Sequence, residues 1–213
     1  MKVRSIDELE EILSNEYSWR RKELTNLRNL AATSRSPIKN TLLRCGVALL
    51  YAHWEGFVKR ISIAYCEYIN YQGIRYREVR SNFHVCAFFE KYQGQYPPKN
   101  FETYLRIVSG TAYSLDEKLT IDAGAYIDTK SNLNSDVLRE ITEKIGLDYS
   151  FFELKENLID ESFLGLRNAI SHGEWRDVED AEFENLYFEI TTLIDSYKNL
   201  VSNAASSKSY LNV

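Results

Sequence analysis

Apolar side chains recur every three or four positions over long stretches of this chain, the pattern of helices that bury one face. The first stretch covers residues 6–34 and opens with a Ser–Ile–Asp–Glu capping box at 5–8. The second covers 38–72, carries the broadest apolar face and is expected to be the central helix of a bundle. The last begins near Asp180. The pattern predicts an all-α fold, a bundle of four to five long helices.

The pattern is weaker over 93–150, which is expected to be an insertion of short helices and loops between two halves of the bundle. No period dominates over 110–134, where a short hairpin and an ordered loop are both compatible with the sequence. Regularity returns at 134–146, a helix that a glycine stops. We expect one helical domain over 1–205 and a disordered polar tail at 206–213.

The stretch 162–175 is where an arginine, a histidine and a helix end meet. Gly173 can take the left-handed conformation that ends a helix, so His172 is expected in the final turn, where the helix dipole favours a protonated imidazole. An apolar stripe for the core is formed by Ile159, Phe163, Leu166 and Ile170. The outward face is expected to carry Leu164, Arg167, Asn168, Ser171 and His172.

The composition restricts the classes of function. A net charge of −5 makes the chain a poor general binder of phosphate backbones, so contact with nucleic acid requires a local patch. The three cysteines lack metal-ligand spacing and are expected to be buried thiols, and no glycine-rich phosphate loop or metal-binding helix motif occurs. We expect a cytoplasmic protein with no cofactor, no metal and no membrane span.

Three further positions or groups are candidates for function. Arg75, Arg77 and Arg80 are interleaved with a tyrosine and could hold RNA, although a solvated turn of mixed charge would look the same. Glu55 lies at the edge of the apolar face, where it either pairs with an arginine of the 162–175 stretch or faces water. His53 is expected at the opposite rim.

Arg167-Asn-Ala-Ile-Ser-His172 resembles the signature of the HEPN superfamily (higher eukaryotes and prokaryotes nucleotide-binding): an arginine, a polar residue and a histidine several positions beyond. The stretches 51–59 and 131–147 resemble the RiboL-PSP type of HEPN domain in order and spacing. The resemblance spans most of 40–200. It implies a usually homodimeric, metal-independent endoribonuclease with Arg167 and His172 as catalytic residues. Such domains are often toxins with a cognate antitoxin.

An arginine and a histidine suit the cleavage of RNA by its own 2′-hydroxyl, which requires proton transfer and a cation at the phosphate. One copy of each is too few, so a two-fold dimer is expected to pair two motifs, with Leu164 as apolar anchor and Asn168, Ser171 and Glu55 in support. An inactive HEPN-like interaction or regulatory module remains the alternative. Glu174 stands where one toxin subtype carries a tyrosine for nucleotidylation, which puts that form of silencing in doubt.

Overall fold

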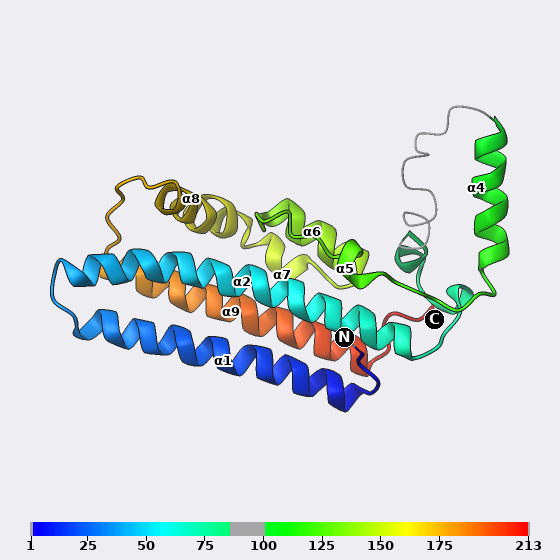
Figure 1. Ribbon diagram of the computed structural model, residues 1–213, viewed down its shortest axis with the longest axis horizontal. Coiled ribbons are helices and arrows are strands. Elements are labelled where there is room, and N and C mark those ends of the chain that lie inside the picture. The colour runs from blue at the N-terminus through cyan, green and yellow to red at the C-terminus, as the bar shows by residue number, and fades with distance from the viewer. Residues whose placement is uncertain (1, 86–100, 213) are drawn as a thin grey trace.

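The computed structural model describes residues 2–85 and 101–212, and within them the prediction of an all-α fold is confirmed. Three long helices, α1 (Ile6–Thr33), α2 (Ile38–Tyr71) and α9 (Asp180–Ser206), lie side by side and each packs against the other two (Figure 1). Their bounds agree with the periodicity to within a residue or two. Because each stripe presents large apolar side chains at helical spacing, the three faces meet in one core.

Contacts along the bundle fix the directions of the helices. Lys39 and Asp180 form an ion pair where α2 and α9 begin. Farther along both helices, the hydroxyls of Ser62 and Tyr197 lie 2.6 Å apart in the core. α9 therefore runs parallel to α2, whereas the short connection 34–37 turns the chain so that α1 is antiparallel to both (Figure 1).

Two predicted helix starts are present, one of them in altered form. Ser5 caps α1 by accepting a hydrogen bond from the backbone N of Glu8 at 3.2 Å. The Glu8 carboxylate accepts from the backbone N of Arg4 at 2.7 Å, so the reciprocal half of the predicted capping box is displaced by one residue. Asn134 caps the helix predicted at 134–146 by accepting from the backbone N of Val137 at 2.9 Å.

Shorter helices form a second layer along α2 (Figure 1). They are α5 (Ala123–Tyr126), α6 (Ser135–Lys144), α7 (Ser150–Glu153), the π-helix η2 (Leu158–Leu164) and α8 (Gly165–Ser171). η2 and α8 hold the arginine–histidine motif, and both pack against α2. The second layer therefore places the motif beside the central helix of the bundle.

The remaining described elements lie at the other end of α2. The short helix η1 (Tyr76–Glu78) follows α2, and α4 (Phe101–Ser114) stands away from the bundle in Figure 1. The region 110–134, for which hairpin and loop were both open, contains the end of α4 and α5 and forms no hairpin in its described residues. The loop predicted at 93–100 lies outside the described residues.

Residues 206–212 are ordered, whereas the sequence predicted a disordered tail at 206–213. Tyr210 is buried, and its ring packs edge-on against Tyr65 and Tyr68 of α2. Its carbonyl accepts a hydrogen bond from the backbone N of Arg80 at 3.0 Å, and Asn212 N donates to the Glu78 carbonyl at 2.9 Å. One aromatic side chain in a polar segment thus holds residues 207–212 against the bundle.

The cysteines differ from one another. Cys66 is buried, as predicted, whereas Cys45 is exposed because its position on α2 faces away from the core, and Cys86 lies outside the described residues. In the described part of the chain, no helix combines the length and apolar character needed to cross a membrane.

Candidate functional site

The first half of the motif segment is not an α-helix. In η2 the backbone N of Gly165 donates to the carbonyl of Asp160, five residues back, which is the hydrogen bond of a π-helix. The wider turn changes which side chains face the core, and Phe163 and Leu164 are both buried, at 0% and 6% exposure. The prediction that Leu164 points outward as an anchor for a dimer is therefore wrong.

Asp160 joins the π-helix to α6. Its carboxylate accepts hydrogen bonds from the backbone N of Ser135, at 2.8 Å, and from the Ser135 hydroxyl. A carboxylate at a helix start satisfies a free N–H and opposes the positive end of the helix dipole. The π-helix and the start of α6 are consequently held as one unit beside the motif.

The second half of the motif segment ends as predicted. Gly173 has a φ of +81°, and Glu174 N donates to the Ala169 carbonyl at 2.9 Å, which together form a Schellman-type helix end. His172 is the last residue before this turn, with its backbone N bonded to the Asn168 carbonyl. Its imidazole is exposed and has no hydrogen-bond or ion-pair partner among the described residues. His172 is thus available to a ligand at the helix end.

Arg167 turns the other way, toward α2. Its Cζ lies 3.6 Å from the centroid of the Tyr51 ring, a cation–π contact, and its Nη2 donates to Asn132 Oδ1 at 3.5 Å. Its Nε is buried and makes no hydrogen bond. Within the described residues Arg167 forms no ion pair, so this half-buried cation has no carboxylate to neutralise it.

Tyr51 is itself held in place. Its hydroxyl accepts a hydrogen bond from the backbone N of Leu133 at 2.6 Å. Burial, with the negative charge of Glu55 as the next cause, raises the pKa of Tyr51 to about 12. The phenol therefore keeps its proton at neutral pH.

The hydrogen-bond partner of Glu55 is a hydroxyl, not a cation. Its Oε1 accepts a hydrogen bond from the Thr129 hydroxyl at 2.6 Å. No ion pair joins it to Arg167 in the described part of the chain, so the arginine partner is not the arrangement found. The carboxylate of Glu55 acts on the site through its charge, which contributes to the raised pKa of the tyrosine on which Arg167 lies.

The loop that supplies these partners has an unusual backbone. Lys130 and Ser131 have φ values of +54° and +52°, in the left-handed region that costs non-glycine residues about 1–3 kcal/mol each. The turn places the Asn132 side chain at Arg167 and the Leu133 N–H at Tyr51. Arg167 thus contacts a loop with a strained backbone and follows shortly after the π-helix in the chain.

Comparison with known proteins decides the family. The family model described as RiboL-PSP-HEPN matches residues 15–203, which include the motif, α2 and the 128–133 loop. The chain belongs to the RiboL-PSP-HEPN family. Neither the search of curated proteins nor the search of solved structures found a match.

The proposed site residues of this RiboL-PSP-HEPN chain lie in different surroundings. Arg167 contacts α2 and the 128–133 loop, whereas His172 is exposed at the helix end, and no contact joins the two side chains within the described residues. Asn168 is half-buried and Ser171 is exposed on the same short helix. Among the described residues, no three side chains of His, Cys, Asp or Glu are grouped so as to hold a metal ion.

The three arginines suggested for RNA binding lie away from the motif. Arg75 and Arg77 contact Asp116, at 3.7 and 2.6 Å, and Arg80 donates to the Gly146 carbonyl at 3.1 Å. They follow the C-terminal end of α2, roughly 30 Å along that helix from Tyr51 at 1.5 Å per residue. They form no common site with Arg167.

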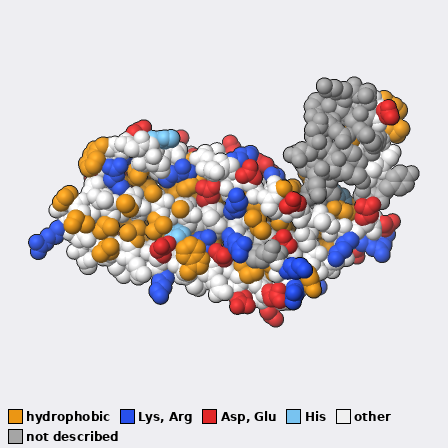
Figure 2. Space-filling view, in the orientation of Figure 1, with side chains coloured by type: hydrophobic (Ala, Val, Ile, Leu, Met, Phe, Trp, Pro, Cys, Tyr) orange, Lys and Arg blue, Asp and Glu red, His pale blue; other side chains and the backbone are white. Residues whose placement is uncertain are grey.

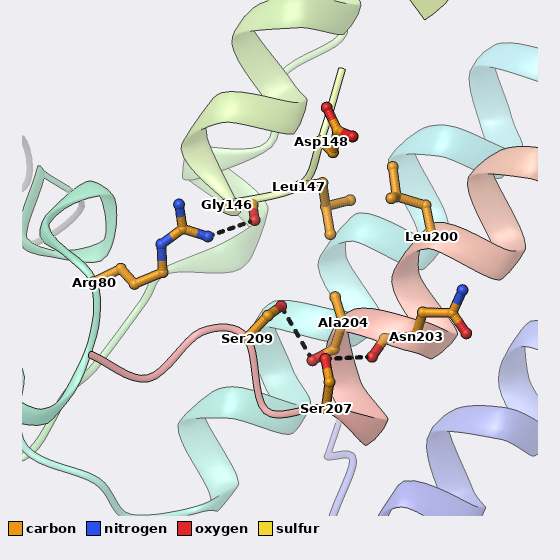
Figure 3. Close-up of a pocket in the computed structure, with 9 residues that line it drawn as sticks. All are labelled: Arg80, Gly146, Leu147, Asp148, Leu200, Asn203, Ala204, Ser207 and Ser209. Carbon is orange, nitrogen blue, oxygen red and sulfur yellow. Dashed lines mark hydrogen bonds between the residues drawn. The ribbon is translucent and has the colours of Figure 1, made fainter. Parts of the chain in front are cut away.

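Arg80 borders a cavity of about 470 Å³ at this distant end, shown in Figure 3. The cavity lies between the turn that follows α6 and the last turns of α9. Its lining is Arg80, Gly146, Leu147, Asp148, Leu200, Asn203, Ala204, Ser207 and Ser209. Several polar groups there are already bonded within the chain, including the hydroxyls of the two serines, which donate to carbonyls of α9.

His53 is buried, not at the rim. It is 5% exposed, its Nε2 lies 2.7 Å from Glu23 Oε2, and the Trp19 ring meets it edge-on. Burial lowers the pKa of His53, an effect that the Glu23 carboxylate opposes and the Arg20 guanidinium reinforces. His53 therefore belongs to the contact between α1 and α2 and not to the motif site.

Sequence reasoning missed Tyr51, Asn132 and Thr129 as parts of the site. Tyr51 lies in the helix predicted at 38–72, one helical turn before Glu55, and two side chains at this spacing share a helix face. That spacing was a usable signal. The other two residues gave no comparable signal, because the backbone turn that delivers them is not visible in their residue types.

Proposed function

We propose that this chain is a metal-independent endoribonuclease that cuts RNA by attack of a ribose 2′-hydroxyl on the adjacent phosphate. Membership of the RiboL-PSP-HEPN family supports a role directed at RNA or nucleotides. Because basic and acidic side chains are interspersed over the face seen in Figure 2, we assign RNA contact to individual residues and not to a broad basic surface.

The observation that carries the proposal is the state of Arg167. An arginine that is half-buried, stacked on Tyr51 and without an ion pair among the described residues retains both charge and free N–H donors. A guanidinium in this state is suited to phosphate oxygens, which accept its forked donors and supply the missing negative charge. The network behind Tyr51 fixes the direction in which those donors are offered.

The reaction is a transesterification. The 2′-oxygen forms a bond to phosphorus as it loses its proton to a base, and the bond to the 5′-oxygen breaks as that oxygen gains a proton from an acid. The products are a 2′,3′-cyclic phosphate and a 5′-hydroxyl. We assign the proton transfers to His172 and the stabilisation of the charged phosphorane to Arg167.

We further propose a homodimer. Two proton transfers are best served by two histidines, and a two-fold axis near the exposed His172 would bring a second one into the same cleft. Burial of Leu164 removes the anchor first suggested for that interface, so the proposal rests on the exposure of the helix end and on the chemistry. The role as toxin of a toxin–antitoxin or defence system, with a cognate antitoxin, is carried over from the family resemblance.

A catalytically inactive HEPN-like interaction or regulatory module is the second candidate. The observation in its favour is that Arg167 and His172 of one chain face different surroundings. A monomer would then bind a phosphate at Arg167 without a base or acid beside it.

The test uses end-labelled single-stranded RNA with EDTA present throughout. Wild type should leave a 2′,3′-cyclic phosphate and a 5′-hydroxyl, while DNA and 2′-O-methyl RNA should survive. His172→Ala and Arg167→Ala should each lower the rate by about a hundredfold or more. Arg4→Ala, a change in an exposed arginine just before α1, serves as the matched control and should cleave normally.

Three outcomes would count against the proposal in different ways. Loss of cleavage on addition of EDTA would reject the metal-free mechanism. Equal rates in all four proteins would place the activity elsewhere or in a contaminant. Binding of RNA with no cleavage under any condition would favour the inactive module.

A further inference from the structure

The loop after the motif helix is tied to the first turns of α2 by three side chains. Arg44 donates from Nη2 to the Glu174 carbonyl at 3.0 Å, and Asn40 donates to Asp177 Oδ1 at 2.9 Å. At the start of α9, Lys39 forms its ion pair with Asp180. Contacts at successive positions join the loop to the bundle.

This loop displays Trp175. The indole is 77% exposed, in contrast to Trp54 in the core, which is fully buried. The guanidinium of Arg44 lies over the ring with its Cζ 5.0 Å from the centroid. The arginine therefore supports one face of the indole while most of the side chain remains open to solvent.

The position of Trp175 relative to the motif is also constrained. Trp175 is three positions after His172 in the sequence, so their Cα atoms are at most about 11 Å apart. The Schellman-type turn, with Glu174 N bonded to the Ala169 carbonyl, brings the chain back toward α8 between them. A ligand that occupies the motif could therefore reach the indole with a neighbouring group.

We propose that Trp175, supported by Arg44, is a stacking platform for one unpaired base next to the phosphate that Arg167 binds. The inference rests on the proposed function, because its ligand is a single-stranded RNA. An exposed aromatic ring accepts any base by stacking, so the platform selects unpaired RNA over duplex without reading its sequence. Trp175 is a binding residue in this scheme, and Arg44 positions it.

The charges around the loop favour a base over a phosphate at this point. The carboxylates of Glu174 and Glu179 are exposed and form no ion pair within the described residues, and they would repel a phosphate. Asp177 is a third carboxylate, bonded only to the neutral amide of Asn40 in the described part of the chain, so the two cations Arg176 and Arg44 only partly offset the negative charge. In this scheme Arg167 therefore binds the phosphate, and Trp175 stacks on the uncharged base.

The test measures binding, not cleavage. A fluorescent 2′-O-methyl single-stranded oligonucleotide resists attack by its own sugar, and its affinity follows from fluorescence anisotropy with EDTA present. Trp175→Ala should weaken binding by about tenfold or more, and Trp175→Phe should keep most of the affinity because it keeps a ring. Phe188→Ala, which removes another exposed aromatic (66% exposed) from α9, is the matched control and should bind as wild type.

A duplex version of the oligonucleotide provides the second arm, since the platform predicts no loss for Trp175→Ala on a duplex. Equal affinity of wild type and Trp175→Ala for the single strand would overturn the platform, as would failure of wild type to bind it. If Trp175→Ala changed the oligomeric state in light scattering, Trp175 would be a contact between protein chains and the platform would be wrong. Binding that depends on Trp175 in a protein that never cleaves RNA would reject the nuclease and leave the platform standing.

Discussion

Arg167 on α8 reaches across to Tyr51 on α2, so that the cation lies over the ring with its Cζ 3.6 Å from the centroid. The tyrosine is in turn fixed at its hydroxyl, which accepts a hydrogen bond from Leu133 N. The position of Arg167 is thus set by Tyr51 and by the backbone of Leu133 that holds the tyrosine. Two substitutions at Tyr51 can distinguish the contribution of its ring from the contribution of its hydroxyl.

Tyr51→Leu should remove the cation–π contact and lower cleavage by about tenfold, mainly through kcat, because the guanidinium loses its support. Tyr51→Phe should keep the ring and most of the activity. It should still lower the free energy of unfolding by about 1–3 kcal/mol, because the buried Leu133 N–H loses its acceptor. Steady-state kinetics and urea unfolding measure the two effects. A Tyr51→Phe protein less active than Tyr51→Leu would contradict this assignment.

The stability of the α1–α2 contact should depend on His53 at mildly acidic pH. Burial lowers the pKa of His53 in the folded state below its ordinary value near 6.5, so the unfolded chain binds the proton more readily. The contribution of His53 is fully present above about pH 6.5 and is lost as the pH falls toward the folded pKa. Urea unfolding at pH 7.5 and 5.5 should show a larger loss of stability in wild type than in His53→Gln. A wild type that gains stability on acidification relative to the variant would refute the assignment.

Gly173 should be needed for its backbone conformation and not for space. At φ +81° any side chain is strained, although nothing lies within 4 Å of the position that a Cβ would take. Gly173→Ala should therefore lower the free energy of unfolding by about 1 kcal/mol, and Gly173→Asn by less. Gly124→Ala in α5, where a Cβ would meet only ordinary contacts, is the control and should be neutral within error. Equal effects of the two alanine substitutions would show that the helix end tolerates a side chain.

Asp160 should stabilise the unit formed by η2 and α6. Asp160→Ala leaves Ser135 N without its acceptor and removes a charge from the start of α6, a loss of about 1–2 kcal/mol. Asp160→Asn retains one carbonyl oxygen and should lose less. Hydrogen exchange should show faster opening at the start of α6 in Asp160→Ala while the amides of α9 stay protected. Uniform acceleration over both helices would mean that the effect is global.

The sequence was informative where one helix face decides the structure. The stripes of α1, α2 and α9 repeat over many turns, so the bounds of these helices followed from periodicity, and Gly173 marked the end of α8. Leu164 was misplaced because the periodicity assumed 3.6 residues per turn, whereas η2 takes a wider turn that the contact of Asp160 with Ser135 stabilises. A change in helix type that depends on a partner from another segment leaves no mark in local spacing.

The same limit applies to the site and to the end of the chain. Arg167 and His172 were found from their residue types and their spacing, but the partner of Arg167 is more than a hundred positions earlier in the sequence. The burial of Tyr210 was not predicted, because it lies in a polar segment and its partners are two tyrosines near the C-terminal end of α2. Contacts between segments far apart in the sequence could not be predicted from composition or from hydrophobic periodicity.

The parallel course of α2 and α9 has a consequence for synthesis of the chain. Tyr51 leaves the ribosome long before Arg167, and the loop that carries Trp175 is anchored only when Asp180 can meet Lys39. Contacts of such large sequence separation close late, after the intervening segments have been ordered. A nascent chain that ends before α9 thus already contains Tyr51 and Arg167 but lacks the ion pair between Lys39 and Asp180, so the loop that carries Trp175 would be anchored only after α9 has been made.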